Sequence, residues 1–278
     1  MRPQSDSLFK LLAISCLLWS GASYGKLFVP DIEPWAFWVS SDEECTIAID
    51  HDDWQRFLDV YLATDYADGV NRVDYAGVTP EDRARLQVYL DRMSLTDPRE
   101  YALAEQQAYW LNLYNALTVS VVLEHYPVKS IRKIYGGLLG TGPWNEALIE
   151  VAGQALSLND IEHRILRPIW RDPRIHYAVN CASFGCPNLA ADVYTASNMD
   201  AMLDAGARAF INNPRGVAWQ AGKLQLSSIY DWYDTDFGAT REEQLQHLAS
   251  YADEELAKRL QEYSGRIRYD YDWRLNAQ

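Results

Sequence analysis

The chain has 278 residues, of which 48% are hydrophobic and 23% are charged, and its formal net charge is −14. This composition, close to the globular average, excludes a disordered or fibrous chain. The acidity excludes nucleic acid and anionic lipid as main partners, since both require a basic surface. The four cysteines are too few for a disulfide scaffold. Composition therefore describes an acidic globular protein without naming a reaction.

Residues 1–25 have the pattern of a secretory signal peptide. A basic start precedes a short apolar stretch, and Ser23 and Gly25 match a small-residue cleavage site. We therefore expect export to the periplasm or the medium, with an uncleaved anchor or a lipoprotein attached at Cys16 as alternatives. The apolar stretch is shorter than the ~20 residues of a membrane span. No later stretch approaches that length, so we expect no integral span in the mature chain.

Helix start signals recur in the first half of the mature chain. An N-cap followed by proline and acidic residues occurs at Thr79-Pro80 and again at Asp97-Pro98. An irregular N-terminal segment, 26–50, comes first. The elements expected after it are a helix from about His51, a short strand over 70–75, and helices over 83–93 and 99–125.

The second half mixes hairpins with helices and begins with a glycine-rich loop over 136–143 that we expect to be flexible. The expected elements are a hairpin over 148–158 turning at Gly153, a short helix capped by Asn159 or Asp160 and closed by Pro168, a buried strand over 175–180, a helix over 199–212, a hairpin over 217–226 turning at Ala221-Gly222, a helix over 241–263 and a strand over 266–271. Because strands and helices do not alternate regularly, we predict one α+β domain over 51–278, with buried helices packed on short antiparallel strands or hairpins.

The long helix over 99–125 is apolar almost all round, which marks it as buried. Glu105, Asn112 and Asn115 nevertheless fall near one face of it by helical spacing. A buried amide without partners costs about 1–3 kcal/mol, so these side chains must bind something specific. Two interpretations follow, a structural network that fixes nearby loops and a polar wall of a functional site.

Two cysteines follow the predicted strand over 175–180. Removal of the signal segment leaves Cys45, Cys181 and Cys186, an odd number that implies a free thiol or an intermolecular bond in an oxidising compartment. Cys181 and Cys186 fit three interpretations, namely a short-loop disulfide, inert buried thiols, or a nucleophilic thiolate activated by a histidine. The spacing is unlike that of a zinc site, and we expect no metal and no cofactor.

Candidate bases for such a thiolate are His163 and His176. On a regular strand His176 shares a face with Asn180, whereas Cys181 has the opposite parity, so His163 is at least as good a candidate. Two further stretches, 227–238 and 269–273, interleave aromatic and acidic residues. They fit either a groove for sugars or cationic peptides or a packed loop whose acids face water.

These motifs together resemble the domain of unknown function 547 family. Weaker similarity reaches Phe210–Asn212 and Asp272–Asn276, where Arg274 replaces an expected serine. The central similarity covers about residues 99–213 and comprises, in order, Ala108–Leu117, Leu158–His163, Asp172–Ser183 and Gly185–Leu189.

The resemblance implies little about function, because the family is named for lacking one. Its bacterial members are often exported, and no cofactor is established for them. Other members occur inside eukaryotic cells, which makes a structural Cys181–Cys186 disulfide less attractive. A likeness to papain-like or transglutaminase-like thiol enzymes is loose, because their nucleophilic cysteine opens the central helix, whereas this helix carries Asn112 and Asn115.

Two functions from different classes fit these features, so the sequence does not decide whether the protein is an enzyme. The first is a non-catalytic binding or scaffold module of the cell envelope with a peptide or glycan ligand. The alternative is a cysteine-dependent hydrolase or acyl transferase, in which Cys181 or Cys186 is the nucleophile, a histidine is the base, and Asn112 or Asn115 orients the reacting groups.

Overall fold

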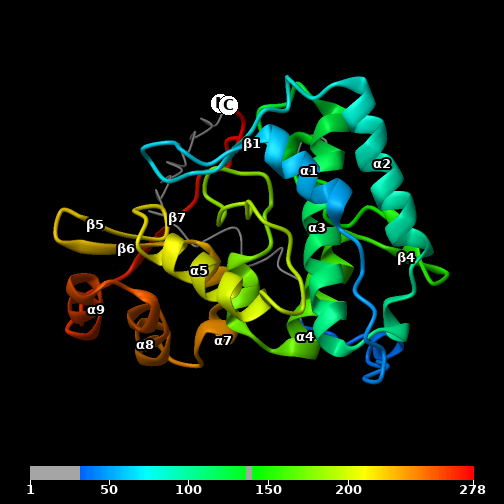
Figure 1. Cartoon of the computed structure of the whole chain (residues 1–278). Coiled ribbons are helices and arrows are strands. Elements are labelled where there is room, and N and C mark those ends of the chain that lie inside the picture. Colours follow the sequence, from blue (N-terminus) through cyan, green and yellow to red (C-terminus); the bar gives the residue numbers. More distant parts are fainter. Residues whose placement is uncertain (1–31, 136–139) are drawn as a thin grey trace, which may run out of the picture.

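The structure is a computed structural model that describes residues 32–135 and 140–278. The predicted signal peptide and residues 136–139 of the glycine-rich loop lie outside the described residues. Figure 1 shows the helices α1 (Asp52–Tyr61), α2 (Pro80–Leu95) and α3 (Leu103–His125) gathered on one side of the molecule. A second group of helices lies on the other side with a small sheet, as expected of one α+β domain.

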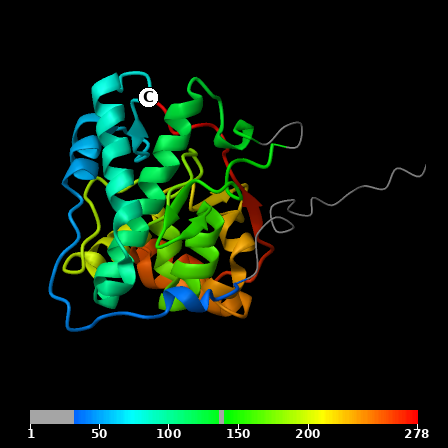
Figure 2. The ribbon, with the colours of Figure 1, turned by 90° about the vertical axis from the view of Figure 1, so that its right-hand side faces the viewer.

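The long helix α3 is the centre of the first group. It is buried along almost its whole length and runs beside α2 (Figure 2). Thr79 caps α2 by accepting a hydrogen bond from the backbone N–H of Asp82 at 3.1 Å, and Pro80 follows at the first helical position. The signal at Asp97-Pro98 instead begins a short 3-10 helix, η3 (Pro98–Glu100), so α3 starts a few residues later than predicted.

The strands of residues 32–135 and 140–278 form three small sheets. In two of the hairpins, β3–β4 and β5–β6, a pair of residues with positive φ makes the turn at Ala152-Gly153 and at Ala221-Gly222, which confirms both predicted turns. The third hairpin pairs β1 with β2. The strand β7 pairs with β6 in parallel, although only antiparallel pairs were expected. The strands are β1 (Leu62–Ala63), β2 (Arg72–Val73), β3 (Ile149–Val151), β4 (Gln154–Leu156), β5 (Val217–Gln220), β6 (Lys223–Ser227) and β7 (Arg268–Asp270).

The predicted strand over 175–180 was wrong. The segment forms a 3-10 helix, η6 (Pro173–Tyr177), because Asp172 accepts a hydrogen bond from the N–H of Arg174 at 2.8 Å and Pro173 fixes the first helical position. The apolar residues on either side of His176 pack into different hydrophobic clusters, Ile175 into one around α3 and Tyr177 into a second one. His176 is therefore buried between the two clusters.

The helix before η6 also differs from the prediction. Ser157 caps it, not Asn159 or Asp160, because Ser157 and Asp160 exchange two hydrogen bonds in a capping box. A π-helical stretch, η5 (Asp160–Leu166), continues into α4 (Arg167–Trp170), since proline is tolerated in the first turn of a helix. The chain leaves α4 at Arg171 with a left-handed φ of 52°.

The second group contains α5 (Met199–Ile211), α6 (Ile229–Trp232) and α7 (Asp234–Phe237). The predicted helix over 241–263 is divided into α8 (Arg241–Tyr251) and α9 (Glu254–Gln261). Asn212 causes the break, because its amide binds the carbonyl of Tyr251 and the N–H of Asp253. Across the two described stretches, every helix is too short or too polar to cross a bilayer.

Candidate functional site

Asn115 on α3 binds the backbone of the segment that leads to Cys181. Its Nδ2 donates to the carbonyl of Ala178 at 2.9 Å, and its Oδ1 accepts from the N–H of Asn180 at 2.8 Å. Asn112 makes the same pair of bonds to the carbonyl and N–H of Tyr194, at 2.8 and 3.0 Å. Each buried amide therefore fixes a different loop, and Asn115 fixes the one that carries the thiols.

We predict that Asn115→Ala lowers the free energy of unfolding by about 2–4 kcal/mol, because it leaves a buried carbonyl and a buried N–H unpaired. Urea unfolding followed by tryptophan fluorescence measures the change. Asn145→Ala, at an exposed position, is the matched control and should change stability by about 0.5 kcal/mol or less. Equal losses of unfolding free energy in the two variants would contradict the conclusion that Asn115 fixes the loop that carries the thiols.

Both cysteines that follow this segment are free thiols, so the disulfide alternative is not what the structure contains. The N–H of Cys181 donates to the Sγ of Cys186 at 3.0 Å. The Sγ of Cys181 lies 3.2 Å from the hydroxyl oxygen of Ser183 and 3.0 Å from that of Tyr271. We call Cys181, Ser183, Cys186 and Tyr271 the thiol cluster.

The two sulfurs of the thiol cluster differ in their pKa values. The hydrogen bond from the Cys186 side chain lowers the pKa of Cys181, and those from Ser183 and Tyr271 add to this effect against the opposing effect of burial. Burial and the neighbouring Cys181 raise the pKa of Cys186 well above its usual range. Cys181 is partly exposed, whereas Cys186 is buried. Any thiolate in this cluster therefore belongs to Cys181.

The backbone around the thiols is held by a distant segment. Ala182 has a left-handed φ of 54°, which is uncommon outside glycine, and its N–H is held by the Oδ1 of Asn180 at 2.9 Å. The residues after Tyr271 lie across this loop. Their carbonyls, at Asp272 and Arg274, accept from the N–H groups of Gly185 and Phe184, both at 2.8 Å. These contacts bring the Tyr271 hydroxyl to the sulfur.

The histidines belong to a second group, which we call the histidine cluster and which consists of Glu162, His163, Arg167, His176 and Asp236. One carboxylate oxygen of Asp236 binds both the Nε2 of His176 and the Nε of Arg167, each at 2.7 Å. Arg167 also donates from Nη1 to the Nδ1 of His163 at 2.8 Å. Because arginine only donates, Nδ1 of His163 must accept, and the ring is neutral.

The charges of the histidine cluster follow from its contacts. Burial, and then the charge of Arg167, lower the pKa of His163 to about 4. Burial opposes ionisation of Asp236, but the hydrogen bonds from His176 and Arg167 outweigh it and hold the carboxyl pKa far below its usual value. The pKa of Glu162 is also lowered, because His163, His176, Arg167 and a hydrogen bond from Tyr114 outweigh burial. Both acids are therefore carboxylates.

One buried atom of the histidine cluster has no hydrogen-bond partner. The Nδ1 of His176 lies 3.8 Å from the Oε1 of Glu162, while its ring stacks on Tyr233 at 4.1 Å between centroids. The negative charge of Glu162 opposes ionisation of Cys181 as well, so the two clusters influence each other electrostatically. Within residues 32–135 and 140–278, however, no histidine nitrogen makes a hydrogen bond to either sulfur of the thiol cluster.

The sequence did not reveal that Asp236 is the partner of His176 or that Tyr271 is the partner of Cys181. Asp236 lies in the aromatic and acidic stretch over 227–238, whose acids fitted a packed loop facing water, yet this carboxylate faces a buried arginine and histidine. Tyr271 lies 90 positions after Cys181. Only the adjacency of Glu162 to His163 gave a local signal. Within the described ranges, no group of histidine, cysteine and acidic side chains has a geometry that could hold a metal ion.

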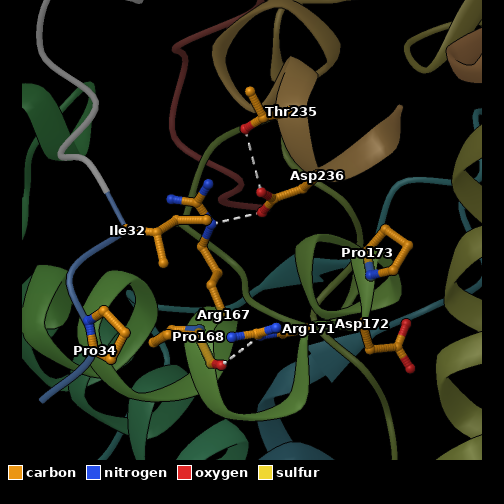
Figure 3. Close-up of a pocket in the computed structure, with 9 residues that line it drawn as sticks. All are labelled: Ile32, Pro34, Arg167, Pro168, Arg171, Asp172, Pro173, Thr235 and Asp236. Atoms are coloured by element: carbon orange, nitrogen blue, oxygen red, sulfur yellow. Dashed lines mark hydrogen bonds and ion pairs between the residues drawn. The ribbon is translucent and has the colours of Figure 1, made fainter. Parts of the chain in front are cut away.

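A pocket of about 460 Å³ opens beside the histidine cluster (Figure 3). Figure 3 shows the Arg167 guanidinium and the Asp236 carboxylate at its edge, joined to each other. Arg171 also lines it, is exposed, and makes no ion pair with any described residue. Most of the remaining wall is apolar. The lining residues are Ile32, Pro34, Arg167, Pro168, Arg171, Asp172, Pro173, Thr235 and Asp236.

The segment from α3 to α5 contains both thiols of the thiol cluster, both histidines of the histidine cluster, and the two buried asparagines Asn112 and Asn115. Residues 98–211 match the family model described as "Protein of unknown function, DUF547". The segment that is similar to this family model therefore supplies most of the two clusters, whereas Asp236 and Tyr271 come from the chain that follows it. Comparisons with curated proteins and with solved structures gave no match.

Proposed function

We propose that the protein is a binding module that holds peptides by a free carboxylate in the pocket beside the histidine cluster, without acting on them. The observation that carries this proposal is Arg171, a lining cation without an ion pair in the described chain, next to the buried Arg167–Asp236 pair. A peptide carboxylate placed there gains a charge-assisted hydrogen bond without displacing an existing ion pair.

The walls of the pocket suit the last side chain of such a peptide. Ile32, Pro34, Pro168 and Pro173 give an apolar surface, and proline rings lose little freedom when a ligand packs on them. Arg167 is held in place by Asp236 and His163. The polar side of the pocket is therefore arranged before the ligand arrives.

The charge of the chain favours basic peptides. A formal net charge of −14 attracts cationic ligands over long distances and accelerates their encounter at low salt. The sequence over residues 1–25 supports placing this activity in the periplasm or outside the cell, where envelope peptides are available. Glycans are the other ligand class that the sequence suggested, and they are an outcome of the test.

The experiment is calorimetric titration with a basic peptide that has a free carboxyl terminus and with the same peptide amidated. Amidation should weaken binding at least tenfold, equivalent to about 1.4 kcal/mol. Arg171→Ala should weaken binding of the free peptide by a similar factor and should abolish the difference between the two peptides. Arg266→Ala, at an exposed arginine away from the pocket, is the matched control and should bind as the parent chain does.

Two results would overturn this proposal. Equal affinity for the free and the amidated peptide would exclude carboxylate recognition. Saturable binding of neutral envelope glycans, with no binding of either peptide, would assign the module to the other ligand class.

A cysteine hydrolase is the second proposal. The free, partly exposed Cys181 with its lowered pKa favours it. Against it, His163 is bound to Arg167 and His176 to Asp236, so a base at the sulfur would require rearrangement of the histidine cluster. The two proposals separate in one variant, because Cys181→Ala should retain peptide binding if the protein is a binding module and should lose all turnover if it is a hydrolase.

A further inference from the structure

The side chains around Cys181 can stabilise a thiolate, although no described histidine makes a hydrogen bond to its sulfur. The sulfur lies 3.0 Å from the Tyr271 hydroxyl and 3.2 Å from that of Ser183. Hydrogen-bond donors aimed at a sulfur favour its charged form, and the thiolate is the reactive form of cysteine. A site built in this way needs no neighbouring base to generate its nucleophile.

A second thiol lies in contact with the first. Cys186 is only 4% exposed, its Sγ accepts from the N–H of Cys181 at 3.0 Å, and its thiol lies 3.7 Å from the carbonyl oxygen of Val179. The loop between them is short and is held by backbone bonds to Asp272 and Arg274. A reactive, accessible thiolate beside a protected partner thiol is the usual arrangement of a redox-active pair.

We infer that Cys181 and Cys186 form a redox-active dithiol that reduces hydroperoxides, with Cys181 as the attacking thiolate and Cys186 as the resolving thiol. In the first step the Cys181 sulfur attacks the terminal oxygen of the hydroperoxide, the O–O bond breaks, and the leaving alkoxide takes a proton to give the alcohol. Cys181 is then a sulfenic acid. In this step the thiolate is oxidised and the peroxide is reduced.

In the second step the Cys186 sulfur attacks the sulfur of the Cys181 sulfenic acid. The S–S bond forms, the S–O bond breaks, and the released hydroxide takes the Cys186 proton to leave as water. An external dithiol then exchanges with the disulfide and returns both cysteines to thiols. Tyr271 and Ser183 are positioning residues, because their hydroxyls lie within hydrogen-bond distance of the Cys181 sulfur and favour the thiolate.

This inference is independent of peptide binding in the pocket. The thiol cluster shares no residue with the pocket lining. Loss of one activity in a variant should therefore leave the other intact.

The test treats the reduced full-length chain with hydrogen peroxide or cumene hydroperoxide and follows each cysteine by mass spectrometry. Cys181 should be oxidised at least tenfold faster than Cys45, and the product should be a Cys181–Cys186 disulfide that dithiothreitol reverses. Cys186→Ser should stop the reaction at a sulfenic acid on Cys181, which dimedone traps. Cys181→Ser should abolish the rapid reaction, whereas Cys45→Ser, the matched control, should not change it.

The roles of the Tyr271 and Ser183 hydroxyls are tested by the pH dependence of Cys181 labelling. Tyr271→Phe and Ser183→Ala should shift the pH dependence of iodoacetamide labelling at Cys181 to higher pH while the cooperative urea unfolding transition is retained, which separates the loss of a hydroxyl from unfolding, because unfolding would also return the thiol to its usual pKa. Oxidation of Cys181 no faster than of Cys45, or trapping of the sulfenic acid on Cys186, would overturn the inference. Cooperative urea unfolding of the same samples shows that the chain is folded, and peptide titration tests the proposed function separately.

Discussion

Replacing Arg167 by alanine is expected to lower the free energy of unfolding by about 3–5 kcal/mol, because removing one partner of a buried pair leaves the other charge uncompensated. The guanidinium of Arg167 is 4% exposed and the carboxylate of Asp236 14% exposed. The same substitution also removes the donor to His163. Asp236 then keeps its bond to His176 but loses that to Arg167, and His163 loses its donor, so urea unfolding should show the loss directly.

The matched control is Arg85→Ala. Arg85 makes an ion pair with Asp82 at 3.9 Å, but its side chain is 39% exposed. Exposed pairs contribute little, so this variant should lose about 1 kcal/mol or less. A similar small loss for Arg167→Ala would show that the buried pair does not stabilise the fold.

Acidification from pH 7 to pH 5 is expected to destabilise the folded chain by several kcal/mol. Burial is the main cause that lowers the pKa values of His51, His163 and His247, each to about 4 from the usual 6.5. Between these two values the unfolded chain binds protons that the folded chain does not. The free energy of unfolding is therefore not reduced by these histidines above about pH 6.5, and it declines as the pH falls towards 4.

The size of the effect follows from the pKa difference. At pH 5 each histidine contributes a loss of up to about 2 kcal/mol, since one pKa unit is worth about 1.4 kcal/mol. The lowered pKa values of Glu162 and Asp236 act in the same direction at lower pH, because their stabilisation is present above the pKa of the unfolded carboxyls and is lost as the pH falls further.

Urea unfolding at a series of pH values between 7.5 and 4.5 measures this dependence. His51→Gln should reduce the slope of stability against pH by about a third, if the three buried histidines contribute equally. Asn145→Ala, at an exposed position without a titrating group, is the control, and its slope should equal that of the parent chain. An unchanged slope in His51→Gln would contradict the assignment.

Local signals in the sequence were enough to predict much of the fold. The capping threonine and proline at the start of α2 and the two hairpin turns at Gly153 and Gly222 depend on neighbouring residues alone. The break between α8 and α9 depends instead on Asn212, some forty positions earlier. Alternating apolar residues around His176 fitted a strand equally well, and only the Asp172 cap and the two hydrophobic clusters select a 3-10 helix.

The site was predictable only in part for the same reason. Asn115, Cys181, Cys186 and the two histidines could be selected because polar and reactive residues stand out within apolar or small-residue surroundings. Their partners could not, since Asp236 is 60 positions from His176 and Tyr271 is 90 from Cys181. Contacts between residues so far apart in the chain produce no periodicity or characteristic spacing that a single sequence could reveal.

The distance between Cys181 and Tyr271 has a consequence for the newly made chain. At a synthesis rate of roughly 5–20 residues per second, the 90 intervening positions take about 5–20 s to add. During that interval both cysteines of the cluster exist without the phenol that favours their charged form. The thiol cluster is therefore complete only after the segment that follows β7 has been made, so the lowered pKa of Cys181 is a property of the finished fold.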